Sequence, residues 1–120
     1  MTIKELKENP ELVNLMTEDL DEFSEDTEVV FEAWAIGYDK EGNICLVVID
    51  GRHQGQGDGA SIYETALICS FLGLTDAINL DGGGSSAIWS SETGVLNHPS
   101  DNKVFDHEGE RVVPNIIGVF

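Results

Sequence analysis

Basic residues are scarce in this chain of 120 residues: six lysines and arginines stand against 23 aspartates and glutamates, and the net charge is −17. Such a charge repels phosphates and anionic lipids, so the sequence predicts neither a nucleic-acid partner nor binding to a membrane surface. Long apolar runs are missing as well, since the run ICLVVI at 44–49 is far too short to cross a bilayer. No basic and apolar leader opens the sequence, so we expect no signal peptide within it.

Cysteine is nearly absent, because only Cys45 and Cys69 occur and both lie inside apolar segments. This placement favours two buried free thiols, although sequence spacing leaves a disulfide between them open. Without a Cys–His spacing pattern, the sequence predicts no structural zinc site and no metal ligands. A divalent cation such as calcium, held by the acidic loops, stays an alternative, because hard cations prefer oxygen ligands.

The length suits a single domain with one modest core. Eleven of the 23 acidic residues fall within residues 1–32. We therefore interpret residues 1–28 as an acidic helical segment and residues 29–120 as the main domain. The sequence leaves the oligomeric state open.

The main domain opens with strand patterns at 29–38 and 44–50, which the turn sequence DKEGN joins into a hairpin. A helix follows from about Ile62 to Leu72, with Ser61 as its N-cap and Glu64 as the capping-box partner. Helical spacing places one apolar face of this helix at Ile62, Ala66, Cys69 and Leu72.

The strand TDAINL at 75–80 follows the helix, so residues 44–80 read as a βαβ unit with two parallel strands. Shorter strands at 86–90 and 94–98 predict a second hairpin, and VVPNIIGVF at 112–120 predicts a last strand. The expected fold class is α+β or α/β, with a mixed sheet, a βαβ unit and flanking helices.

Two glycine-rich loops would follow the ends of the parallel strands, where ligands bind in open α/β sheets. The first is DGRHQGQGDG at 50–59, in which His53 is interpreted as a surface histidine, and the second is DGGGSS at 81–86. Consecutive glycines let N–H groups approach an anion, so the second loop is either an anion cradle or a tight turn.

The chain has only two arginines, Arg52 and Arg111, and each presents a planar fork of donors that suits phosphate. A plain ion pair with a nearby acid is the alternative for both. Among the acids, Asp81 is either a reactive carboxylate or a turn cap, and Glu64 is either reactive or only the partner of Ser61. A pair of carboxylates could hydrolyse a glycosidic bond, with a retaining or inverting outcome that sequence does not decide.

Four motifs occur in one order: VVIDGR at 47–52, DAINLDGGGSSA at 76–87, LNHPSD at 96–101 and ERVVPNIIGV at 110–119. Together they resemble the phosphodiester glycosidase domain family over roughly Ala35–Phe120. The resemblance implies hydrolysis of a sugar-1-phosphodiester of the N-acetylhexosamine type, between the anomeric carbon and the phosphate oxygen. Free sugar would leave and a phosphomonoester would remain, so the expected partner is a small-molecule or glycan phosphodiester.

The resemblance also implies the site and its setting. It implies no cofactor, and it suggests a periplasmic or extracellular location. Arg52, Asp81 and Glu64 would be the catalytic residues. The substrate-binding residues would be Arg111, Gly82, Gly83, Gly84, Ser85, Ser86, Asn79, Asn97, Asp101 and Asn115.

Some residues depart from the family pattern. Ala33 and Trp34 stand where many relatives carry an Arg-Thr pair, Ala87 replaces a threonine, and residues 1–34 do not resemble the upstream half of family domains. These departures support a second hypothesis, a non-catalytic module that binds carbohydrate or phosphodiester.

Overall fold

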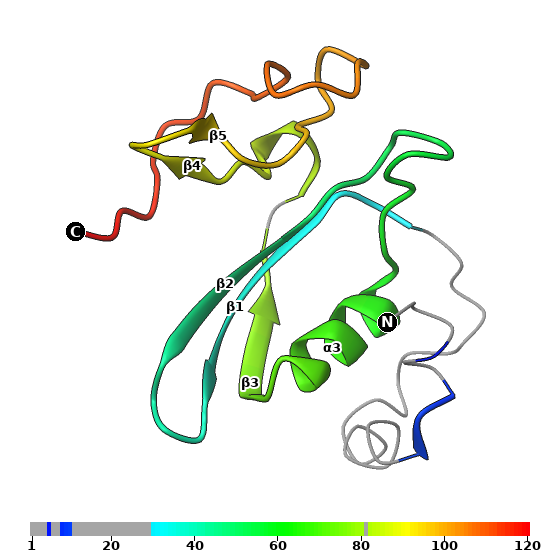
Figure 1. Cartoon of the computed structure of the whole chain (residues 1–120), viewed down its shortest axis with the longest axis vertical. Helices are drawn as coiled ribbons and strands as arrows, with labels where there is room; N and C mark the ends of the chain where they lie inside the picture. The colour runs from blue at the N-terminus through cyan, green and yellow to red at the C-terminus, as the bar shows by residue number, and fades with distance from the viewer. Residues whose placement is uncertain (1–4, 6–7, 11–29, 81) are drawn as a thin grey trace.

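The computed structural model describes residues 5, 8–10, 30–80 and 82–120. The helices expected within residues 1–28 therefore lie largely outside the described residues. In chain order, the elements are β1 (Ala33–Asp39), β2 (Ile44–Ile49), α3 (Ile62–Phe71), β3 (Leu74–Asn79), the 3-10 helix η1 (Gly83–Ser85), β4 (Trp89–Ser90) and β5 (Gly94–Val95). They form a small domain of mixed helix and strand content (Figure 1). None of the helices described is both long enough and apolar enough to cross a membrane.

The predicted first hairpin is confirmed. β1 and β2 pair antiparallel from Ala33 opposite Ile49 to Tyr38 opposite Ile44. Asp39 closes the turn, because its Oδ1 accepts hydrogen bonds from the main-chain N–H groups of residues 41 and 43, at 3.0 and 2.8 Å. An aspartate in this position is typical of a turn that the side chain itself stabilises.

The expected βαβ unit with two neighbouring parallel strands is not confirmed. The strand order is β2-β1-β3, and β1 is antiparallel to both neighbours, so the sheet is not mixed. β2 and β3 do run in the same direction, but β1 lies between them. The hairpin turn fixes β1 beside β2, and β3 then pairs with the free edge of β1. The sequence pattern does not indicate whether β3 pairs with β1 or with β2.

The shared direction of β2 and β3 has a consequence for function. The loops that follow them, including the two glycine-rich loops, leave the sheet at the same end (Figure 1). The predicted meeting of these loops therefore survives the corrected strand order.

The helix forms as predicted, with a different buried face. Its N-cap is Ser61, and Gly73 follows its end with φ +83. The buried residues are Thr65, Leu67 and Cys69, whereas Ile62 and Leu72 are exposed. Apolar residues lie all around this helix, so periodicity could not select the face that packs on the sheet.

The cysteines are both free thiols, and Cys69 is buried. Burial is the main cause that raises the pKa of Cys69, and the nearby Cys45 adds to it. The thiol of Cys69 is therefore an unreactive part of the core.

The second hairpin forms between β4 and β5, but the expected last strand does not. Residues 112–120 have no regular secondary structure, and Val112, Ile116 and Val119 are exposed. A strand requires a neighbour for its main-chain hydrogen bonds, and no described strand pairs with this segment. The segment has the apolar pattern of a strand, but none of the described strands pairs with it.

The capping box of α3 yields a stability prediction. Ser61 Oγ accepts a hydrogen bond from the N–H of Glu64 at 3.2 Å, and Glu64 Oε2 accepts one from the N–H of Ser61 at 2.8 Å. We expect Ser61→Ala to lower the free energy of unfolding by about 1 kcal/mol, because the helix N-terminus loses its acceptor. Urea unfolding measures this, with the exposed Ser91→Ala as control, expected within about 0.5 kcal/mol of the parent. Equal stabilities for the two variants would contradict the cap.

Candidate functional site

The turn that follows β3 lies against the start of β1. We call residues 82–86 the glycine turn. The N–H of Gly83 donates a hydrogen bond to the main-chain oxygen of Glu32 at 3.0 Å, just after Leu80 N–H donates to Trp34 O at 2.9 Å. A Cβ on Gly82 would overlap the same Glu32 oxygen. Only glycine at 82 lets the two backbones approach this closely.

Each glycine of the turn meets a different neighbour. Gly83 has φ +66, and a Cβ there would lie 3.1 Å from Nη1 of Arg52. A Cβ on Gly84 would overlap the carboxylate of Asp101. The three consecutive glycines thus admit a carbonyl, a guanidinium and a carboxylate in turn.

Arg52 has an unusual backbone and a free side chain. Its φ is +62, a left-handed conformation that costs a non-glycine residue about 1 kcal/mol or more. Its side chain is exposed, and within the described part of the chain the guanidinium makes no hydrogen bond or ion pair. A solvent-open groove of about 640 Å³ lies beside it, lined by Val30, Gln54, Gly55 and Asp58 as well as Arg52.

Arg111 binds the other side of the turn. Its Nε and Nη2 donate to the two carboxylate oxygens of Asp101 at 2.8 and 2.9 Å, and its N–H donates to Gly84 O at 2.8 Å. Its Nη1 lies 3.5 Å from Ser85 Oγ. The fork therefore forms the ion pair that was one of the two sequence-based interpretations.

Both arginines act on Asp101. The hydrogen bonds from Arg111 are the largest cause that holds the pKa of Asp101 below its ordinary value, and the charges of Arg111 and Arg52 add to it. Arg52 and Arg111 thus converge on one carboxylate beside Gly84.

Glu32 is a residue of this region that the sequence analysis missed. It is 0% exposed, Ser100 Oγ donates a hydrogen bond to its Oε2, and its Oε1 has no partner. Burial is the main cause that raises its pKa; the charge of Asp50 adds to the rise, while the Ser100 hydrogen bond and the charges of Arg52 and His53 oppose it. The signal in the sequence was the single acid inside the apolar run VVFEAWAIGY.

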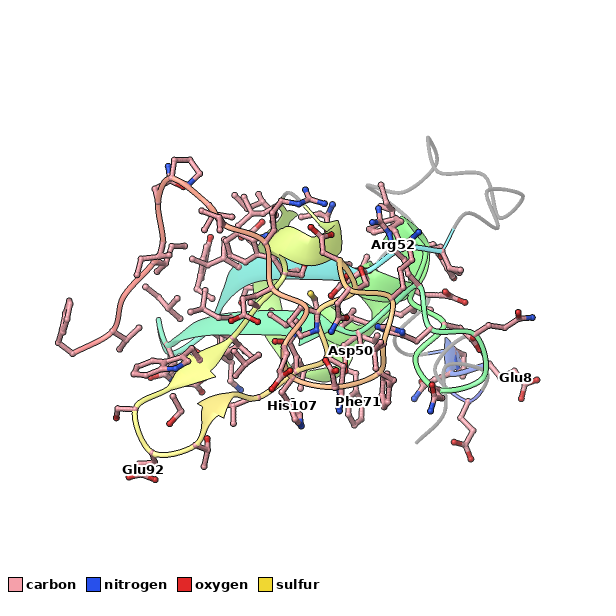
Figure 2. All side chains as sticks on the ribbon, turned by 90° about the horizontal axis from the view of Figure 1, so that it is seen from above. Glu8, Asp50, Arg52, Phe71, Glu92 and His107 are labelled. Carbon is pink, nitrogen blue, oxygen red and sulfur yellow. The ribbon has the colours of Figure 1, made fainter. Side chains whose placement is uncertain are left out.

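Asp50 fastens the loop after β5 to the end of β2. Its Oδ1 accepts a hydrogen bond from His98 N–H at 2.8 Å, and its Oδ2 lies 2.7 Å from His98 Nδ1. The His98 ring stacks on Phe105, with centroids 3.9 Å apart. Figure 2, which looks at the loop end of the molecule, shows Asp50 between Arg52 and His107.

His53 is not the surface residue that was expected. It is 6% exposed, its Nε2 is buried without a partner, and its ring meets the Phe105 ring edge-on at 5.2 Å. The tight turn formed by His53 N–H and Gly57 O, at 3.0 Å, directs the side chain inward.

The remaining candidate residues have structural surroundings. Asn97 is buried and joins the glycine turn to the next loop, because it accepts from Ile88 N–H at 2.9 Å and donates to Ser86 O at 2.6 Å. Ser86 is buried with an unpaired Oγ. Glu64 caps α3, Asn79 ends β3, Asn115 lies in the exposed C-terminal segment, and Asp81 lies outside the described residues.

The described residues contain no group of three or more histidine, cysteine or acidic side chains with a metal-binding arrangement. The structure therefore offers no support for the alternative of a calcium site in this part of the chain.

Gly84→Ala tests the close approach to Asp101. We expect a loss of about 1–3 kcal/mol in the free energy of unfolding, because the new methyl group must displace the Asp101 carboxylate. NMR should also show loss of the protected Nε–H signal of Arg111. Gly42→Ala is the control: Gly42 has φ +84 but no atom within 4 Å of the added Cβ, so it reports backbone strain of about 1 kcal/mol alone. An unchanged Arg111 signal in Gly84→Ala would contradict the packing.

Comparison with known proteins shows to which family the chain is similar. The sequence profile of the phosphodiester glycosidase family matches residues 8–120. The N-acetylglucosamine-1-phosphodiester alpha-N-acetylglucosaminidases of mouse, cattle and human are 34%, 31% and 34% identical to this chain over 86 residues. These alignments cover 72% of this chain but only 16% of each mammalian protein, so the chain spans about a sixth of their length.

A solved structure is also similar to this chain. A crystal structure from Burkholderia pseudomallei superposes with a TM-score of 0.57 and 41% identity, over 65% of this chain and 15% of that one. The profile match begins well before Ala35, the start of the range over which the sequence resembles the family, and runs to the last residue. From this match, the chain belongs to the phosphodiester glycosidase family.

Proposed function

We propose that the chain binds a sugar-1-phosphodiester, with its phosphate against Arg52, and hydrolyses the bond between the anomeric carbon and the phosphate oxygen. One observation carries the proposal: within residues 30–80 and 82–120 the Arg52 guanidinium has no hydrogen-bond or ion-pair partner, and it stands on a strained backbone in a protein of net charge −17. With so many carboxylates available, an arginine that lies over a glycine turn and pairs with none of the described ones supports a role in binding an external anion.

The charge of the leaving group explains how such a site would accelerate the reaction. As the C–O bond breaks, its electron pair moves onto the phosphate oxygen, and negative charge grows there. A fixed guanidinium aimed at that oxygen stabilises the transition state more than the ground state. The Gly83 N–H is already bonded to Glu32, so the guanidinium groups, rather than this amide, supply the main donors.

The reacting carboxylate in this proposal is Asp81. It directly precedes the glycine turn in sequence, and a carboxylate there would stabilise the oxocarbenium-like centre or activate the attacking water. Glu64 was the other candidate, but its Oε2 is used in the cap of α3, which supports a structural role. A phosphomonoester is a good leaving group, so the reaction does not require a strong general acid.

The sugar is proposed from the relatives. Three mammalian proteins that match this chain are named as N-acetylglucosamine-1-phosphodiester alpha-N-acetylglucosaminidases. We extend an N-acetylhexosamine phosphodiester substrate to this chain on that basis.

The test is release of free N-acetylglucosamine from UDP-N-acetylglucosamine. We expect Arg52→Ala to lower kcat/KM by about 100-fold, which corresponds to roughly 2.7 kcal/mol of transition-state stabilisation. Arg52→Lys should fall in between, since it keeps the charge and loses the fork. Lys103→Ala is the matched control, because Lys103 is also exposed, cationic and left-handed, with φ +61, and should leave kcat/KM unchanged.

The outcomes separate two functions. Binding of the substrate without turnover would support a non-catalytic binding module, the second hypothesis for this family member. Turnover that survives Arg52→Ala unchanged would exclude the proposed phosphate site. Arg52→Gly adds a structural check, since it should be more stable than Arg52→Ala by about 1 kcal/mol because glycine accepts positive φ.

A further inference from the structure

Glu32 contacts both the glycine turn and the segment at Ser100. Its main-chain oxygen accepts the hydrogen bond from Gly83 N–H at 3.0 Å and thereby holds the glycine turn, over which Arg52 lies. Its side chain accepts the hydrogen bond from Ser100 Oγ. Ser100 directly precedes Asp101, the carboxylate that binds Arg111 through both oxygens. One residue therefore contacts both the turn over which Arg52 lies and the segment whose carboxylate binds Arg111.

The surroundings of Glu32 are tightly packed. Gly51, which precedes Arg52, fits against it only without a side chain, since a Cβ on Gly51 would overlap the Glu32 N–H group. Glu32 is 0% exposed and Ser100 is 6% exposed, so their hydrogen bond is shielded from water. A buried bond of this kind resists rearrangement, because breaking it leaves polar atoms without any partner.

The charged groups around Glu32 are Asp50, Arg52 and His53, and its Oε1 remains unpaired. Arg52 and His53 favour the ionised carboxylate, whereas Asp50 and burial favour the protonated acid. An ionised Glu32 would place a negative charge behind Arg52, and a protonated Glu32 would leave the guanidinium charge uncompensated for an incoming anion.

We propose that Glu32 is a positioning residue for anion binding at Arg52 and Arg111, holding the glycine turn and the Ser100–Asp101 segment in register with each other. This inference rests on the proposed function for its biological meaning, but it concerns the geometry of an anion site. The ligand class is a tetrahedral oxyanion, such as the phosphodiester group of the substrate.

The experiment measures binding of inorganic sulfate to the 120-residue chain by isothermal titration calorimetry. Sulfate is tetrahedral and keeps the same charge from pH 4 to pH 9, so any pH dependence belongs to the protein. We expect Glu32→Ala and Ser100→Ala each to weaken binding on the order of tenfold, because either change removes the hydrogen bond between Glu32 and the Ser100–Asp101 segment. The double variant should be no weaker than the single variants, since both remove one and the same bond.

Glu32→Gln separates positioning from simple packing. Its amide oxygen can still accept the Ser100 hydrogen bond, so sulfate affinity at pH 4.5 should stay within about threefold of the parent. The raised pKa of Glu32 means that its proton is lost only above the ordinary value of 4.5, and the new negative charge then opposes sulfate. As pH rises above 4.5, the parent should lose affinity relative to Glu32→Gln. The ratio of the two affinities removes pH effects that both proteins share.

The controls keep the proposal falsifiable. Glu92→Gln makes the same chemical change between β4 and β5, away from Arg52 in Figure 2, and should bind sulfate as the parent does. Circular dichroism checks that each variant is folded, and Ser100→Ala and Glu32→Gln carry the test if Glu32→Ala does not fold. Parent-like binding by a folded Ser100→Ala, or no sulfate binding by the parent, overturns the inference. Sulfate binding that follows the expected pattern, without hydrolysis of the sugar diester, would support the inference and refute the proposed function.

Discussion

The close approach of two backbones determines most of this structure. The turn after β3 reaches the start of β1 only because residues 82–84 carry no side chains, and the hydrogen bond from Gly83 to Glu32 fixes the contact. That contact brings together the loop after β2, the glycine turn and the segment around Ser100. Arg52 belongs to the first of these segments, and Asp101, which binds Arg111, belongs to the third.

The two arginines of this acidic protein have different surroundings. Arg111 has its carboxylate, Asp101, and the pair is bidentate. Arg52 has none among the described residues, although it lies close enough to act on the pKa values of both Asp101 and Glu32. In the proposed anion site, Arg111 also fixes the Asp101 segment, whereas the fork of Arg52 pairs with none of the described carboxylates.

The sequence predicted the features that depend on local chemistry. The hairpin turn at Asp39, the capping box of Ser61 with Glu64 and the closeness of the two glycine-rich loops all follow from residue type and spacing. What it could not predict depends on contacts between distant segments. The place of β1 between β2 and β3, the helix face that packs inward and the irregular C-terminal segment are each decided by which surfaces find a neighbour.

Glu32 and His53 show the same limit at the site. Both are buried by segments far away in sequence, Glu32 by Ser100 and His53 by Phe105. The sequence shows Glu32 as the one acid within an apolar run. Its burial could not be predicted, because that depends on the contact with Ser100. Glu32 lies outside all four of the family motifs that the sequence displays.

The sheet also bears on how copies of the chain behave together. β2 and β3 are its outer strands in the described structure, and Ile44 and Ile78 on them are 74% and 61% exposed. Open strand edges with apolar side chains are templates for intermolecular pairing. The net charge of −17 opposes this pairing, because like-charged molecules repel one another. Added salt or acid weakens that repulsion, so the chain is best kept dilute in neutral buffer of low ionic strength.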